Sequence, residues 1–231
     1  RPVINSRAEL LPQSYLVLTT DSQDIIQNYH TCCPESVYEV DNLPAFNIDE
    51  GYVVLLNEEL LVIDEMYYNE KMHSPFLRNF KGVSLERVSL NIPSSDEKNW
   101  QSASSASGYG TPGCKNSQQA DPNNNSPAVK FEPYSFSPNL DGFNDEFIIT
   151  YALDKPGFTG NIKIFDKSGR FVLSLVENEI LGTSGEFTWD GTDQTGKRQP
   201  LGIYIITVEF FSYEGEIYRW KDSVVLTGIL D

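Results

Sequence analysis

The stretch LGIYIITVEFFSYEGEIYRWKDSVVL (residues 201–226) contains two long runs of β-branched and aromatic side chains. Such side chains favour the pleated, half-buried surface of a β-sheet. Tyr213-Glu214-Gly215 separates the two runs, and its glycine can adopt the left-handed conformation that a tight turn needs. The stretch therefore predicts a β-hairpin.

Five similar runs precede this hairpin, each bounded by turn-prone residues. They cover residues 131–136, 147–153, 161–165, 171–176 and 186–189. Asp166-Lys167-Ser168-Gly169 joins two of them as a second predicted hairpin. Seven short strands with turns between them predict a β-sandwich in the second half of the chain.

The first half also contains strand patterns, at residues 14–20, 51–57, 60–64 and 83–88. Asn57-Glu58-Glu59 joins two of them at hairpin distance, and residues 22–29 predict a short helix capped by Ser22. Residues 118–129 are polar and contain two prolines, which predicts a linker. We therefore expect an all-β chain with two Ig-like β-sandwich domains, residues 1–117 and 130–231, joined by a short polar linker.

The acidic composition argues against nucleic acid and anionic membranes as partners. The chain has 231 residues with 33 acidic and 17 basic side chains, a net charge of −16. This charge repels nucleic acid and anionic membranes, and the densest basic stretch is only Lys197-Arg198. No apolar run reaches the ~20 residues of a membrane span, and the first residues, RPVINSRAEL, lack the apolar region of a signal peptide. We expect a soluble chain, either mature or trimmed.

Four strings in the first half form one pattern: Gly-Val-Ser-Leu-Glu-Arg-Val from Gly82, Asn99-Trp100-Gln-Ser-Ala, Gly110-Thr111-Pro112-Gly113 and Asn116-Ser117. Together they resemble the closing segment of a bacterial lamin-tail domain, an Ig-like sandwich of secreted proteins. The opening strands of that family do not precede Leu16. The resemblance therefore implies an N-terminally incomplete domain, completed by an N-terminal segment outside this chain or by a protein partner.

The second half contains Ser-Pro-Asn-Leu-Asp-Gly-Phe-Asn-Asp-Glu-Phe after Phe136, Ile164-Phe-Asp-Lys-Ser-Gly-Arg, Phe187-Thr-Trp-Asp-Gly-Thr-Asp and Leu201-Gly-Ile-Tyr. These strings resemble the Ig-like domain of flagellar hook-capping proteins and the C-terminal modules of surface proteins in gram-negative anaerobes, including type IX secretion cargo. The resemblance implies an extracellular or outer-membrane location and a role in adhesion, spacing or assembly.

The segment from Asn139 to Glu146 concentrates oxygen donors around Gly142. Calcium prefers six to eight oxygen ligands from a looping backbone, so we expect calcium as a possible cofactor. The candidate ligands are Asn139, Asp141, Asn144, Asp145 and Glu146. The alternative is a tight turn in which Asn and Asp bond their own backbone.

The second half of the chain also contains a second acidic loop and three aromatic residues with predicted positions. The loop from Trp189 to Asp193 could approach the first loop, although a structural turn is the simpler interpretation. We expect Trp189, Tyr204 and Trp220 in the core. Tyr204 also fits the corner hydrogen bond of Ig-like domains.

The three cysteines, Cys32, Cys33 and Cys114, permit one disulfide and a free thiol or three buried thiols. Our prediction for an exported chain is a Cys33–Cys114 bridge with Cys32 free. Vicinal cysteines cannot easily bond one another, and His30-Thr31-Cys32-Cys33 lacks the spacing of a zinc site.

No sequence motif supports catalysis. The chain has two histidines, His30 and His73, and no Gly-x-Ser-x-Gly, P-loop or dinucleotide-binding string. The resemblances therefore imply a noncatalytic secreted or cell-surface binding or scaffolding protein with a protein partner. Two alternatives are a glycan-binding accessory module, with Tyr67, Tyr68, Trp100 and Tyr109 as its platform, and an accessory fragment of a larger secreted hydrolase.

Overall fold

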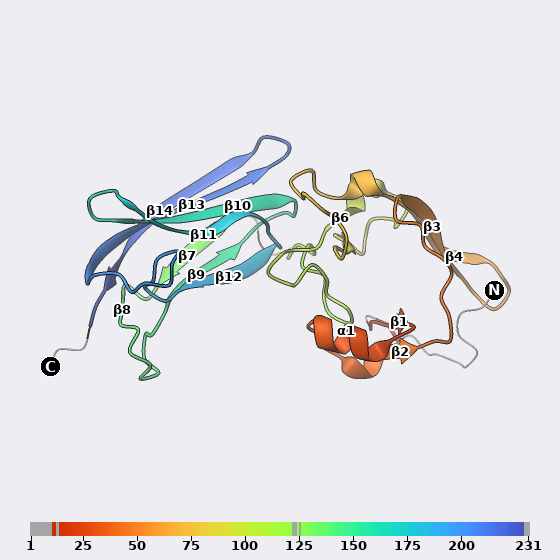
Figure 1. The fold of residues 1–231 in the computed structure, drawn as a ribbon. Helices are drawn as coiled ribbons and strands as arrows, with labels where there is room; N and C mark the ends of the chain where they lie inside the picture. The colour runs from red at the N-terminus through yellow and green to blue at the C-terminus, as the bar shows by residue number, and fades with distance from the viewer. Residues whose placement is uncertain (1–10, 13, 122–123, 125, 229–231) are drawn as a thin grey trace. The chain divides into compact units, whose positions relative to one another are not determined.

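The computed structural model describes residues 11–12, 14–121, 124 and 126–228, and the chain divides into two compact units, residues 1–119 and 120–231 (Figure 1). Strands dominate both units, so the predicted all-β class is confirmed. Residues 1–10, and residues 122–123 and 125 of the predicted linker, lie outside the described part of the chain.

The second unit is a two-layer sandwich, visible in Figure 1 as two sets of strands. One sheet has the strand order β11-β10-β13-β14-β8 and the other β12-β9-β7. The strands are β7 (Ala128–Glu132), β8 (Ser135–Phe136), β9 (Phe147–Ala152), β10 (Phe158–Asp166), β11 (Phe171–Ile180), β12 (Ser184–Trp189), β13 (Gly202–Ser212) and β14 (Ile217–Leu226).

The sequence predicted these strands closely, with one exception. Both hairpins are confirmed, since β10 pairs with β11 and β13 with β14, and Gly169 and Gly215 have positive φ at the turns. The predicted strand at residues 131–136 is instead divided into β7 and β8, which join different sheets. Pro133 lies at the division, where proline cannot donate a ladder hydrogen bond.

The core of the second unit forms because side chains alternate in and out along its strands. Along β9, Phe147, Ile149 and Tyr151 are buried between residues that are only half-buried, and β13 shows the same period. Side chains from both sheets form one cluster. Trp189 and Tyr204 belong to it as predicted, whereas Trp220 is only partly buried and packs against its edge.

The first unit is built differently, from strands that pair only two by two: β1 with β2, β3 with β4, and β5 with β6. Its elements are β1 (Val17–Thr19), α1 (Ser22–Asn28), η1 (Pro34–Ser36), β2 (Val37–Glu39), β3 (Glu50–Leu56), β4 (Val62–Asn69), η2 (Glu70–Met72), β5 (Leu85–Arg87), η3 (Glu97–Asn99) and β6 (Trp100–Ser102). The hairpin at Asn57-Glu58-Glu59 is confirmed as the β3–β4 connection.

Two details of this unit differ from the prediction. Helix α1 is capped by Asp21 rather than Ser22, because the Asp21 carboxylate accepts the Asp24 N–H while the Ser22 hydroxyl donates to Glu39. Gln118, placed in the linker by its polar neighbours, is fully buried in the first unit.

Apolar burial is concentrated in the second unit. Among the described residues of the first unit, Ala103 and Cys114 are the only buried hydrophobic side chains. The first unit therefore depends on polar contacts and a disulfide for its internal order.

Candidate functional site

The predicted calcium loop is a closed polar turn in the second unit. Asp145 accepts three backbone N–H groups, from Asn139 (3.2 Å) and Leu140 (2.6 Å) on Oδ1 and from Gly142 (2.8 Å) on Oδ2. Asp141 accepts the Phe143 N–H at 2.8 Å and the Asn139 side-chain amide at 2.9 Å. The amide of Asn139, followed by the Phe143 N–H, lowers the pKa of the Asp141 carboxyl.

The remaining two candidate ligands contribute less to this turn. Asn144 has a positive φ of 49° and its backbone carbonyl accepts the Ser137 N–H at 2.9 Å. Glu146 is exposed, and no hydrogen bond joins its described side chain to the other four residues. The geometry therefore brings Asn139, Asp141 and Asp145 together through their own hydrogen bonds, as in an Asx turn.

The second acidic loop meets the first at one end of the second unit. A Cβ on Gly191 would lie 3.4 Å from Pro138 Cγ, directly before the first loop. Asp190 Oδ1 accepts the hydroxyl of Thr192, and Asp193 Oδ1 accepts that of Thr195, which lowers the pKa of Asp193. These carboxylates are thus occupied within their own turns.

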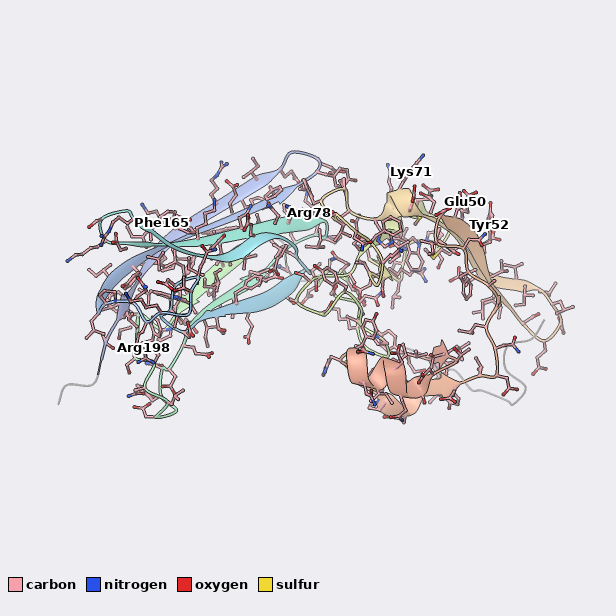
Figure 2. The ribbon with its side chains drawn as sticks, viewed as in Figure 1. Glu50, Tyr52, Lys71, Arg78, Phe165 and Arg198 are labelled. Atoms are coloured by element: carbon pink, nitrogen blue, oxygen red, sulfur yellow. A yellow bond between two sulfur atoms is a disulfide. The ribbon has the colours of Figure 1, made fainter. Side chains whose placement is uncertain are left out.

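A small hollow of about 190 Å³ lies beside both loops and includes a cationic residue, Arg198, labelled in Figure 2. Nearby, the Tyr204 hydroxyl donates to the Pro200 carbonyl at 2.6 Å. This bond confirms the predicted tyrosine corner, and it fixes the chain where it enters β13.

The disulfide joins Cys32 to Cys114, so the predicted Cys33–Cys114 pairing is wrong. The Cα atoms of Cys32 and Cys114 are 5.1 Å apart, within the range that a bridge requires. Cys33 instead begins the η1 turn, where its carbonyl accepts both the N–H and the hydroxyl of Ser36. Neighbouring side chains point in different directions, so only one of the pair can face Cys114.

One group of possible metal ligands occurs among the described residues: His30, Cys32 and Cys114, whose ligand atoms lie within 4.8 Å of one another. Both sulfur atoms are joined in the disulfide, so neither is a thiolate in this state. The group therefore lacks the charged ligands that zinc prefers.

The strings that resemble a lamin-tail domain form a buried polar network that sequence reasoning missed. The buried carboxylate of Glu86 accepts the hydroxyls of Thr111 and Ser117 and the Gln118 N–H. Gln118 in turn donates to the Ser102 carbonyl at 2.8 Å. These hydrogen bonds hold the local structure where apolar burial is small.

A second part of the network is centred on Asn99. Its side-chain amide donates to the Ser89 and Ile92 carbonyls, and its oxygen accepts the Ser89 N–H at 2.8 Å. The sequence signal for both parts was the dense Ser, Thr, Asn and Gln content of residues 99–118.

His73 and Ser102 form a pair with the composition of a catalytic dyad. His73 Nδ1 lies 3.0 Å from Ser102 Oγ, and burial lowers the pKa of His73. However, the Ser102 side chain is only 1% exposed, its oxygen also accepts the Ser74 N–H, and the His73 ring stacks on Phe80. A substrate carbonyl cannot approach this oxygen, so the pair is a structural contact.

The four aromatic residues of the hypothetical glycan platform are half-buried. Tyr67 donates to Glu50, which raises its pKa to about 12, while Tyr68 donates to the Asn47 carbonyl and Trp100 to that of Ser94. Half-buried rings held by such hydrogen bonds expose little of the aromatic surface on which a sugar stacks.

A second hollow lies in the first unit, at the base of the β3–β4 hairpin. It has a volume of about 780 Å³ and is lined by residues between Phe46 and Lys71, of which Glu50 and Lys71 are labelled in Figure 2. Asp49, Glu50 and Glu70 also line it, so the hollow is acidic.

None of the helices that the structure describes has the length and apolarity to cross a membrane.

The second unit is, from these observations, an all-β module with a single packed core and closed polar turns. Residues 130–225 match the family model of the CHU_C type IX secretion signal domain. This match indicates a protein exported to the cell surface or outer membrane.

Solved structures with weak similarity include two flagellar proteins. FlgD of Xanthomonas campestris, studied for hook capping, is 24% identical over 43% of this chain and 68% of its own, with a TM-score of 0.32. FlgD of P. aeruginosa is 23% identical over 35% of this chain, with a TM-score of 0.28, and the chain spans 61% of its length.

PorZ of Porphyromonas gingivalis, a surface component of the type IX secretion system, is 24% identical over 42% of this chain and 11% of its own, with a TM-score of 0.26. A search of curated proteins found no significant match. The lamin-tail resemblance of the first unit stays a prediction.

Proposed function

We propose that this chain is a noncatalytic surface protein in which the second unit directs export by type IX secretion and the first unit binds a protein partner. The match of residues 130–225 to a type IX secretion signal domain carries the proposal. That segment runs from β7 to β14 and so comprises nearly the whole sandwich.

The geometry of the first unit supports a binding role over a catalytic one. Its Ser–His pair is inaccessible, and its buried carboxylate, Glu86, is used by three internal donors. Its longest run of exposed apolar side chains instead lies on β3, β4 and the turn between them. Exposed apolar patches of this kind mark protein interaction sites.

The half-buried aromatic residues favour a protein over a glycan as the partner. Within the described structure, internal hydrogen bonds occupy the polar side-chain atoms of Tyr67, Tyr68 and Trp100. A glycan site needs such groups free to contact sugar hydroxyls.

The test of export compares two forms in a bacterium that has type IX secretion, both carrying the same N-terminal export signal. One form is the whole chain and the other ends at residue 129. We expect the whole chain at the surface or in the medium, detected by surface labelling, and the shortened form inside the envelope.

A reporter protein fused to residues 120–231 provides the matched test of sufficiency. Export of the reporter supports the proposal. Equal surface labelling of the whole chain and the shortened form would overturn the assigned role of the second unit.

A further inference from the structure

The hairpin formed by β3 and β4 (residues 50–69) is exposed on both faces in the half nearest its turn. Successive residues of a strand point to opposite faces of the sheet. Val53 and Val54 are nevertheless each 44% exposed, and Leu55 and Leu56 are exposed as well. The same holds at the start of β4, where Val62 and Ile63 are both exposed. Neither face of this half of the ribbon therefore packs on a core.

The outer edge of β3 is also unpaired. Among the residues that the structure describes, β3 pairs only with β4, in a two-stranded sheet. The second half of β4, from Met66 to Asn69, is half-buried, so β3 is the more accessible edge. A free edge presents a row of backbone donors and acceptors that can bind another strand.

The second unit protects its own edge by devices that the hairpin lacks. The edge strand β11 contains register shifts, a positive φ at Asn178 and the acidic Glu177 and Glu179. Bulges and charges of this kind prevent strand addition. By contrast, Tyr52 to Leu56 of β3 carries five consecutive uncharged, mostly aliphatic residues.

The charges around the hairpin are mostly negative, although Lys71 follows β4 directly and the Arg87 guanidinium lies 3.6 Å from the Asp64 carboxylate. Residues 46–70 contain seven acidic side chains and no Lys or Arg. A second copy of the hairpin would bring the same negative charges together, which disfavours self-pairing. Lipid tails could cover the apolar side chains but could not satisfy the unpaired backbone groups of β3.

From these observations we propose that the outer edge of β3 binds an extended segment of a partner protein, with alternating aliphatic side chains and basic flanks, as an added β-strand. This inference deepens the proposed binding role of the first unit and rests on it. Main-chain hydrogen bonds supply the affinity, side chains at alternate positions supply the fit, and the acidic rim selects basic flanks.

The test measures binding of labelled synthetic peptides to the whole purified chain by fluorescence anisotropy. The first peptide alternates Val and Thr between Lys flanks, and the second has the same centre between Glu flanks. We expect the Lys-flanked peptide to bind at least about tenfold more tightly, and to weaken with added salt, because the rim is acidic. N-methylation of alternate peptide nitrogens on one edge should abolish binding, since it removes the ladder donors.

Two variants locate the site. Val54→Lys with Leu55→Lys places gatekeeper charges in β3 and should abolish binding, whereas Leu140→Lys with Phe143→Lys changes two exposed apolar residues of the second unit and should leave it intact. Glu58→Lys with Glu59→Lys leaves the strand unchanged and should weaken only the Lys-flanked peptide.

Equal binding by wild type and the β3 variant, or no binding of any peptide, would overturn the inference. So would a dimer, detected by light scattering, that the β3 variant abolishes, because the occupant would then be a second copy. Binding to phosphatidylcholine vesicles lost in the same variant would overturn it in favour of lipid. These measurements use purified chain, so their failure leaves the export experiment unaffected.

Discussion

At the scale of single residues, Asp145 stabilises the loop from Asn139 to Glu146, because its carboxylate accepts three backbone N–H groups. We expect Asp145→Ala to destabilise the second unit by about 1–2 kcal/mol even in chelator, since the turn loses its internal acceptor. Thermal melts of wild type and variant in EDTA measure this, with the exposed Glu146→Ala as control.

Calcium at the same loop is a separate prediction from the sequence. Added millimolar calcium should raise the melting temperature of the wild type, because a ligand that binds only the folded state stabilises it. Asp141→Ala should remove that increase. Equal melting temperatures in EDTA and calcium would leave the loop as a turn alone.

The buried hydroxyl of Tyr151 makes the stability of the second unit depend on pH. Burial raises the pKa of its hydroxyl to about 12, so the folded chain keeps a proton that the unfolded chain releases above about pH 10. The stability from this group is complete below about pH 10 and lost as pH rises toward 12. Urea midpoints at pH 8 and pH 11.5 should therefore differ less in Tyr151→Phe than in the wild type, whereas the exposed Tyr134→Phe should match the wild type.

Residue-level prediction from sequence succeeded where a local pattern decides the outcome and failed where geometry does. The hydrogen bond of Tyr204 was predicted from the tyrosine corner of Ig-like domains, and its partner, Pro200, is only four residues away. Cys32 and Cys33 are indistinguishable by spacing to Cys114, and only the η1 turn at Cys33 decides between them. Likewise, Glu86 meets Ser117 and Gln118 across more than 30 residues, which no local pattern reveals.

At the scale of elements, the disulfide holds the segment after α1 against the closing segment of the first unit. We expect Cys32→Ser to destabilise that unit by about 2–5 kcal/mol, because the bridge closes a long loop. Cys33→Ser should change stability by less than about 0.5 kcal/mol. Urea unfolding followed by hydrogen exchange of residues 14–119 measures both, and a mapped Cys33–Cys114 bridge would contradict the expectation.

Strands of the second unit were predictable where buried residues alternate with half-buried ones, as in β9 and β13. The sequence of the first unit contains weaker strand patterns. Its strands β1, β2, β5 and β6 have three residues each, and β1 pairs with β2 across an intervening helix. The candidate binding edge at β3 was recognisable as a strand, but its exposure on both faces was not.

At the scale of the whole molecule, the apolar core lies entirely in the second unit. We expect residues 120–231 to fold alone and to melt cooperatively at the same temperature as the corresponding transition of the whole chain. Reducing agent should lower only the other transition, because all three cysteines precede residue 120. Calorimetry of both forms, with and without reductant, measures this, and a non-cooperative isolated unit would contradict it.

The position of the Cys32–Cys114 bridge also determines how the chain responds to mechanical force. The bridge spans a sequence separation of 82 residues, most of the first unit. A protein held at the cell surface and pulled from both ends can extend only the chain outside this covalent ring. Intact, the ring withholds roughly 270–290 Å of contour length, which reduction would release, so the bridge limits how far the first unit can be stretched.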